Sequence, residues 1–183
     1  MSHVSSVCNF GWKAPNFLLK GVDGKNHSLS ELKGTKGTLI FFICQHCPYV
    51  KAILNNLIRD TAELRTYGIQ SIAINSNDAE HYPEDDFNHM VEISKTDRFS
   101  FPYLWDEDQS IAKRYDALCT PDFFGFNKNL ELQYRGRLDE TKTIVVPNAR
   151  RELFEAMVQI SETDVGPHLQ TASMGCSIKW KTS

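Results

Sequence analysis

The chain has 183 residues, of which 41% are hydrophobic and 23% charged, so it can bury one ordinary core and leaves little room for a second domain. Its formal net charge of -3 and its lack of any run rich in lysine and arginine argue against nucleic acid or an anionic membrane as a partner. The N-terminus has neither the basic nor the apolar segment of a signal peptide, and no apolar stretch approaches the roughly 18 residues of a membrane span. We therefore expect a cytoplasmic protein without membrane contact.

The first half of the chain predicts a hairpin followed by a β-α-β unit. Residues 16–28 contain two short strand patterns around an Asp-Gly turn. Residues 38–43 form an apolar run typical of a buried strand, and residues 70–75 predict a second central strand. Between them, apolar side chains recur at spacings of three and four over residues 50–64, which predicts a helix that ends at Gly68.

The second half predicts a helical insertion, a second hairpin and a closing helix. Residues 86–95 and 108–115 have helical patterns and make up the insertion. Residues 123–137 contain two strand patterns around an Asn-Lys-Asn turn. We expect the closing helix to span residues 149–160, with Asn148 as its N-terminal cap.

The alternation of strands and helices predicts an α/β fold with one domain, residues 1–162. The remaining residues, 163–183, form a polar tail whose only bulky anchors are Ile178 and Trp180. We expect this tail to pack on the domain.

The segment Cys44-Gln45-His46-Cys47-Pro48 places two thiols between the first central strand and the long helix. The unpaired N–H groups and the positive dipole end of a helix N-terminus favour a thiolate, so this placement is typical of dithiol redox chemistry. With Pro48 in the first turn, Cys44 is expected to lie just outside the helix as an exposed nucleophile of low pKa. Cys47, deeper in the helix entrance, is expected to be the resolving thiol. His46 either lowers the pKa of Cys44 further or is an ordinary exposed loop residue.

The cysteine pattern predicts neither a metal site nor any other cofactor. The chain has five cysteines and no second Cys-x-x-Cys or paired histidines. Tetrahedral zinc needs four ligands, and only Cys44, Cys47 and His46 cluster in the sequence.

With Thr120-Pro121 before the second hairpin, the order of elements resembles the thioredoxin-like fold, in the branch of the thiol-specific antioxidant and alkyl hydroperoxide reductase proteins. The resemblance covers roughly residues 10–160, and Gly11–Phe17 and Tyr134–Asp139 are similar to segments of that branch. Residues 174–180, Met-Gly-Cys-Ser-Ile-Lys-Trp, are similar to a tail in one bacterial subgroup of it.

The resemblance implies roles for residues outside the two cysteines. It implies that Pro121 is cis and packs beside both sulfurs, and that the backbone of Thr120 binds a substrate chain; Gln45, inside the motif, is a further candidate for substrate contact. The alternative is an ordinary trans proline that opens the strand at Phe123, and the cis form is favoured over it.

Two positions depart from the family pattern. Peroxidatic members carry a threonine three residues before the reactive cysteine, where this chain has Phe41. Thioredoxins carry a buried acid six residues before the first cysteine, where this chain has Thr38.

The expected function is therefore a thiol–disulfide oxidoreductase that acts through Cys44 and Cys47 on protein or small-thiol disulfides, with an unidentified thiol as electron donor. One alternative is a peroxidase in which Cys44 reacts with a peroxide and Cys47 resolves it. A second alternative is a binding module that keeps the fold and does not use its cysteines for catalysis.

Two further cysteines are candidate redox thiols. Cys119 lies two residues before Pro121, and Cys176 lies on a tail long enough to fold back over the domain. Either could resolve an oxidised Cys44. The alternative is that Cys119 is a small buried apolar residue and Cys176 a free thiol on a tail that packs for structural reasons.

Overall fold

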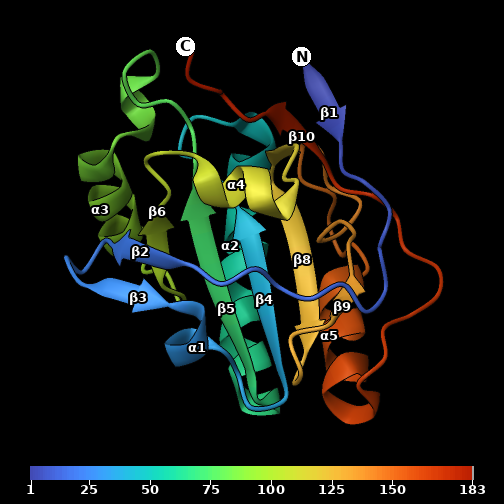
Figure 1. Cartoon of the computed structure of the whole chain (residues 1–183). Helices are drawn as coiled ribbons and strands as arrows, with labels where there is room; N and C mark the ends of the chain where they lie inside the picture. Colours follow the sequence, from blue (N-terminus) through green and yellow to red (C-terminus); the bar gives the residue numbers. More distant parts are fainter. Residues whose placement is uncertain (183) are drawn as a thin grey trace.

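The computed structural model describes residues 1–182 and has a seven-stranded sheet at its centre, in the strand order β3-β2-β6-β5-β4-β8-β9 (Figure 1). These strands are β2 (Leu18–Gly21), β3 (Asn26–Ser28), β4 (Gly37–Phe42), β5 (Ile69–Asn75), β6 (Tyr103–Trp105), β8 (Asp122–Asn127) and β9 (Leu132–Tyr134). A second, three-stranded sheet has the order β1-β10-β7, from β1 (Ser2–Val4), β10 (Met174–Ser177) and β7 (Cys119–Thr120). The small sheet therefore brings the two ends of the chain together beside the large one.

Helices cover both faces of the central sheet, which makes three layers. They are α1 (Leu29–Leu32), α2 (Pro48–Leu64), α3 (Phe87–Thr96), α4 (Ser110–Tyr115) and α5 (Glu152–Thr163), with short 3-10 turns η1 (Arg65–Tyr67) and η2 (Pro83–Asp85). Figure 1 shows α2 behind the sheet and α4 in front of it. None of the helices in residues 1–182 has the length and apolar character needed to cross a membrane.

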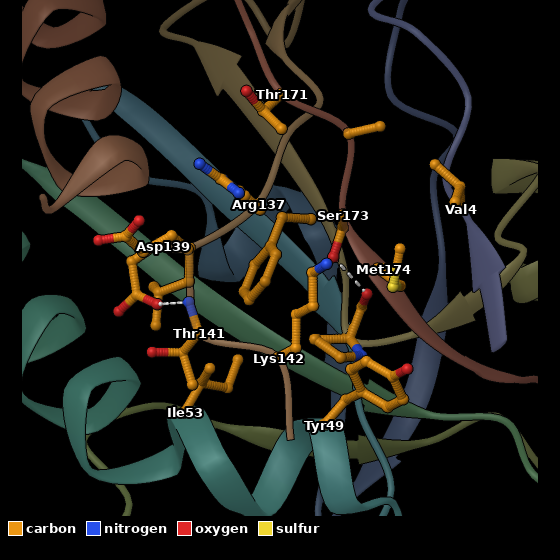
Figure 2. A pocket seen from close by; sticks show the side chains of 15 residues that line it. Val4, Tyr49, Ile53, Arg137, Asp139, Thr141, Lys142, Thr171, Ser173 and Met174 are labelled. Atoms are coloured by element: carbon orange, nitrogen blue, oxygen red, sulfur yellow. Dashed lines mark hydrogen bonds between the residues drawn. The ribbon is translucent and has the colours of Figure 1, made fainter. Parts of the chain in front are cut away.

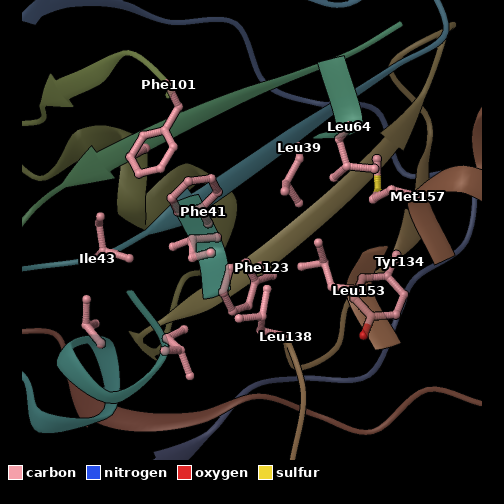
Figure 3. Close-up of a cluster of buried hydrophobic side chains, with 14 of the residues drawn as sticks. Leu39, Phe41, Ile43, Leu64, Phe101, Phe123, Tyr134, Leu138, Leu153 and Met157 are labelled. Carbon is pink, nitrogen blue, oxygen red and sulfur yellow. The ribbon is translucent and has the colours of Figure 1, made fainter. Parts of the chain in front are cut away.

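Strand β4 lies inside the sheet, between β5 and β8, and every one of its residues is buried. It runs parallel to β5 and antiparallel to β8, and alternate side chains enter two different cores. Leu39 and Phe41 pack in the cluster that also holds side chains of α2 and α5, part of which Figure 3 shows. Ile40 and Phe42 enter the cluster on the opposite face, with α4. The rigid end of β4 therefore fixes where the cysteine motif begins.

Helix α2 begins as the sequence predicts, with Cys47 as the N-cap residue and Pro48 in the first turn. The helix continues through the turn η1 to Gly68, whose φ of 75° supplies the left-handed conformation that ends it. Its buried stripe packs against the sheet, which holds the N-terminus of α2 at the carboxyl end of β4.

The structure differs from the sequence analysis in three places. The predicted insertion contains a central strand, β6, which pairs with β5 on one side and β2 on the other. The closing helix starts at Glu152, and Asn148 is not its cap, since Asn148 has a φ of 54°. Arg151 takes the N-cap position instead, and its guanidinium binds Asp60 of α2. The tail supplies β10, a strand that the sequence analysis does not predict.

The predicted division into a domain of residues 1–162 and a tail stays a prediction. In the structure, β10 pairs antiparallel with both β1 and β7, so that Cys176 lies opposite Thr120. Pro121 follows directly, and the Thr120–Pro121 peptide bond is cis, as the resemblance implies.

Gly175 allows the close approach of β10 to β7, so we expect Gly175→Ala to destabilise the protein by about 1–3 kcal/mol. A Cβ atom at this position would overlap the carbonyl oxygen of Thr120, which is a backbone atom and cannot turn away. Urea unfolding measures the change, with Ser177→Ala on the same strand as the control. An unchanged midpoint for Gly175→Ala would mean that the pairing of β10 with β7 does not hold in solution.

Candidate active site

The cysteine motif lies between β4 and α2, but both of its thiols are buried. Cys44 is 2% exposed and Cys47 is 0% exposed. The prediction of an exposed Cys44 is therefore wrong. The Oγ1 atom of Thr120 lies 3.4 Å from the Cys44 sulfur, and the Asp85 carboxylate lies within 4.8 Å of it.

Cys47 lies between Thr120 and the C-terminal strand. Its Sγ atom is 3.1 Å from the carbonyl oxygen of Thr120 and 3.0 Å from the Sγ atom of Cys176. The pairing of β10 with β7 thus brings a third thiol into contact with the motif. Cys119 is on the same strand, β7, but its sulfur points to the carbonyl oxygen of Pro121 at 3.5 Å. Burial raises the pKa of Cys119, so this thiol is not activated.

Asp85 is the residue that the sequence analysis missed. Its carboxylate is fully buried and accepts hydrogen bonds from the backbone N–H groups of Gln45 (2.8 Å) and His46 (3.2 Å). It also accepts a hydrogen bond from the side-chain amide of Asn77 (2.8 Å). The only signal in the sequence was an acidic pair, Asp85-Asp86, after a central strand, where the carboxyl ends of parallel strands form a site-bearing edge.

His46 belongs to the site, but its partner is Asp85. The Nδ1 atom of His46 hydrogen-bonds to Asp85, and its ring stacks on Tyr82 with an interplanar angle of 7° and a centroid distance of 5.7 Å. The Asp85 carboxylate therefore binds the backbone N–H groups of Gln45 and His46 and the imidazole of His46. The sequence analysis had expected this imidazole to act on Cys44.

The hydrogen bond between the two motif thiols acts in opposite directions on their pKa values. Hydrogen bonding with Cys47, burial and the charge of Asp85 together raise the pKa of Cys44 well above its usual value. Hydrogen bonds from Cys44, Cys176 and Thr120, and from the N–H of Val50 in the first turn of α2, lower the pKa of Cys47 to about 5. Within the reduced pair, the hydrogen bond between the sulfurs favours a thiolate on Cys47 over one on Cys44, and the role of each cysteine in the reaction stays a prediction.

This order predicts the pH dependence of the reaction with a disulfide. Because only the thiolate attacks, the rate constant of the reduced protein should change little from neutral pH down to about one pH unit above the pKa and should fall to about half at about pH 5. Stopped-flow mixing with an aromatic disulfide over a pH series measures this profile. A rate that rises steadily up to pH 9 would show that the reacting thiol is not activated.

Gln45 points into the protein rather than toward a ligand. Its side chain accepts a hydrogen bond from the hydroxyl group of Tyr103 and donates one to the carbonyl oxygen of Asp86 at 3.5 Å. These contacts hold the motif loop against β6 and η2. A role of Gln45 in substrate binding stays a prediction.

A cavity of about 290 Å³ lies next to Pro121 (Figure 2). Tyr49 and Ile53 of α2 form one wall, residues 137–142 a second and residues 171–174 of the tail a third. Ser173 donates a hydrogen bond to the carbonyl oxygen of Pro121 at 2.7 Å, which ties the tail to the cis proline. The cavity offers both apolar and charged contacts, including Arg137 and Lys142, next to Pro121, and neither motif cysteine lines it.

Cys44, His46 and Asp85 are also residue types that bind zinc, and their ligand atoms lie within 4.8 Å of one another. The two carboxylate oxygens of Asp85 already accept N–H hydrogen bonds from Gln45, His46 and Asn77. The grouping is thus complete as a hydrogen-bonded cluster, and the absence of a metal site stays a prediction.

The model of the AhpC/TSA family matches residues 10–135, which is more than half of the chain. The chain belongs to the AhpC/TSA family. It is 27% identical over 129 residues to the thiol-disulfide oxidoreductase ResA of Halalkalibacterium halodurans, a match that covers 69% of this chain and 68% of ResA.

Solved structures extend the comparison to the fold. An uncharacterized conserved protein from Geobacillus kaustophilus is 40% identical, with a TM-score of 0.95 over 100% of this chain and 98% of that chain. The thioredoxin domain of a thiol-disulfide oxidoreductase from Bacteroides vulgatus has a TM-score of 0.59 at 14% identity and covers 73% of this chain and 89% of that one. The predicted thioredoxin-like fold is confirmed, and the similarity to the Geobacillus protein includes the C-terminal tail.

In this member of the AhpC/TSA family, a hydroxyl group still lies beside Cys44. Phe41 fills the position of the family threonine and is fully buried in the core. The hydroxyl group of Thr120, 3.4 Å from the Cys44 sulfur, comes instead from the strand before the cis proline. The site therefore combines a dithiol at a helix N-terminus with a hydroxyl group.

Proposed function

We propose that this AhpC/TSA-family protein is a thiol–disulfide oxidoreductase that uses Cys44 and Cys47 on protein or small-thiol disulfides. The observation that carries the proposal is the pair of thiols at the N-terminus of α2, where Cys47 is the N-cap residue. Hydrogen bonding with Cys44 is the first cause that lowers the pKa of Cys47 to about 5. The match to ResA supports the same reaction class.

The proposed reaction begins at the thiolate of Cys47. It attacks one sulfur of a substrate disulfide, the substrate S–S bond breaks, and the leaving thiolate takes up a proton. Cys44 then loses its proton and attacks the Cys47 sulfur of the mixed disulfide, which releases the second substrate thiol. The substrate gains two electrons, and the Cys44–Cys47 disulfide is returned to the dithiol by an external thiol donor. This assignment exchanges the roles that the sequence alone suggested.

Because Cys44 and Cys47 are buried, the substrate disulfide must reach them past Thr120 or past the tail. The cavity beside Pro121 is the candidate entrance for a small disulfide. A cytoplasmic location, which we also propose, would keep the pair reduced and ready to donate electrons.

Turnover with dithiothreitol as electron donor and a protein disulfide as substrate tests the proposal. We expect wild type and Cys8→Ser to catalyse reduction at similar rates, because Cys8 lies outside the site, and we expect Cys47→Ser to lose the activity. Equal rates for wild type and Cys47→Ser would reject the oxidoreductase.

A second candidate function is a thiol peroxidase, which the hydroxyl group of Thr120 beside Cys44 favours. In that reaction, Cys44 takes the peroxide oxygen as a sulfenic acid and releases water or an alcohol, and Cys47 forms the disulfide with loss of water. The rate of the reduced protein with hydrogen peroxide, with the oxidised sulfur identified by mass, separates the two functions. A reaction at Cys44 much faster than that of a free thiolate would establish the peroxidase; the raised pKa of Cys44 predicts a slower one.

A further inference from the structure

The C-terminal strand is built into the active site. Strand β10 pairs with β7 so that Cys176 lies opposite Thr120 and Ser177 opposite Cys119. Gly175 lies against the carbonyl group of Thr120, where no side chain would fit. These backbone contacts fix the position of Cys176 beside β7.

The sulfur of Cys176 is in reach of disulfide exchange. Its Sγ atom lies 3.0 Å from that of Cys47, and a disulfide bond has a length of about 2.0 Å, so a movement of about 1 Å suffices. Cys176 is also more accessible than the motif thiols, because it is half-buried whereas Cys44 and Cys47 are buried. An external thiol can therefore approach Cys176 more easily than either motif sulfur.

We propose that Cys176 is a third redox thiol that carries the disulfide from the buried pair to the surface. This proposal rests on the proposed function, because its first step starts from the Cys44–Cys47 disulfide. The Cys176 thiolate attacks the Cys47 sulfur, the bond between Cys44 and Cys47 breaks, and a Cys47–Cys176 disulfide forms. Cys44 leaves as a thiolate and takes up the proton that Cys176 lost, so the exchange needs no oxidant. The external thiol donor then attacks the Cys176 sulfur and releases Cys47 as a thiolate, and a second donor thiol displaces the first from Cys176, so that the donor leaves as a disulfide and all three cysteines are reduced.

The charges around Cys176 support this order of events. In the reduced protein, burial, a hydrogen bond with Cys47 and the charge of Cys47 raise the pKa of Cys176 to about 11, while Lys179 lowers it. The two contributions from Cys47 disappear when that sulfur is in a disulfide. Cys176 thus becomes more acidic at the stage at which it has to attack.

Disulfide mapping of full-length Cys44→Ser tests the proposal without changing Cys176. The reduced protein is oxidised with diamide, quenched in acid, alkylated and digested, and its disulfides are identified by mass. We expect Cys44→Ser to form a Cys47–Cys176 disulfide and wild type to form both Cys44–Cys47 and Cys47–Cys176. Absence of Cys47–Cys176 from both proteins would overturn the relay.

Reduction kinetics give the second measurement. We expect the oxidised Cys176→Ser variant to be reduced by glutathione at least about tenfold more slowly than wild type, because the donor must reach a buried sulfur. Ser177→Ala, the next residue of β10, should keep the wild-type rate. An equal rate in Cys176→Ser would also overturn the relay. If the relay fails while Cys44–Cys47 still forms and turns over, the proposed function stands; if no Cys44–Cys47 disulfide forms in Cys176→Ser, both fail.

Discussion

Replacing Cys47 with serine should lower the rate constant for reaction with a disulfide at pH 7 by at least about 100-fold. In wild type, the pKa of Cys47 is about 5, so this sulfur is almost entirely thiolate at pH 7. In Cys47→Ser the contribution of Cys47 to the pKa of Cys44 is lost, but burial and the charge of Asp85 still raise that pKa, so only a small fraction of Cys44 is ionised at pH 7. Since the rate follows the thiolate fraction, the loss of Cys47 removes the reactive form.

Cys44→Ser is the matched variant for this prediction. A serine hydroxyl can still donate a hydrogen bond to the Cys47 thiolate, so the first attack should persist and a mixed disulfide should accumulate on Cys47. Stopped-flow rates and mass mapping of the trapped adduct measure both variants. If the adduct instead accumulates on Cys44 in Cys47→Ser at the wild-type rate, the roles follow the order first expected from the sequence.

Asp85→Ala should destabilise the protein by about 3–5 kcal/mol, because it removes the acceptor from a buried cluster. The Asp85 carboxylate forms hydrogen bonds with the backbone N–H groups of Gln45 and His46, the imidazole of His46 and the amide of Asn77. Without it, several donors lose their partner in the interior. The same change removes a charge that raises the pKa of Cys44, so that pKa should fall.

Asp86→Ala is the control for Asp85→Ala. Asp86 is the neighbouring residue and more exposed, and its side chain caps α3 by accepting a hydrogen bond from the N–H of His89, so its loss should cost about 1 kcal/mol. Urea unfolding at pH 7 gives the stabilities, and the ultraviolet absorbance of the thiolate gives the cysteine titration. Equal losses in the two variants would contradict the assigned role of Asp85 as the centre of the motif loop.

Local patterns predicted the elements that carry the cysteines. The apolar run of β4, the spacing along α2 and the stop at Gly68 are properties of neighbouring residues, and they place Cys47 at the helix N-terminus. The resemblance added the cis proline beside them. The features that the sequence did not predict depend on contacts between segments that are distant in the chain.

The missed features show this dependence. Tyr103–Trp105 is a strand of three residues that exists because β5 and β2 pair with it from either side. Strand β10 has a weak strand pattern and is held by β1 and β7, from opposite parts of the chain. Asp85 is buried because its partners on the motif loop, 39 and 40 residues away, offer N–H groups, and nothing in its own neighbourhood indicates them.

The central claim is that Cys44 and Cys47 form a reversible redox pair. Equilibration of the Cys176→Ser variant with mixtures of reduced and oxidised glutathione, followed by acid trapping and mass analysis, tests it most directly. We predict a single two-electron transition between the dithiol and a Cys44–Cys47 disulfide. A pair that stays reduced at every ratio, or that only binds glutathione without forming the intramolecular disulfide, would contradict the claim.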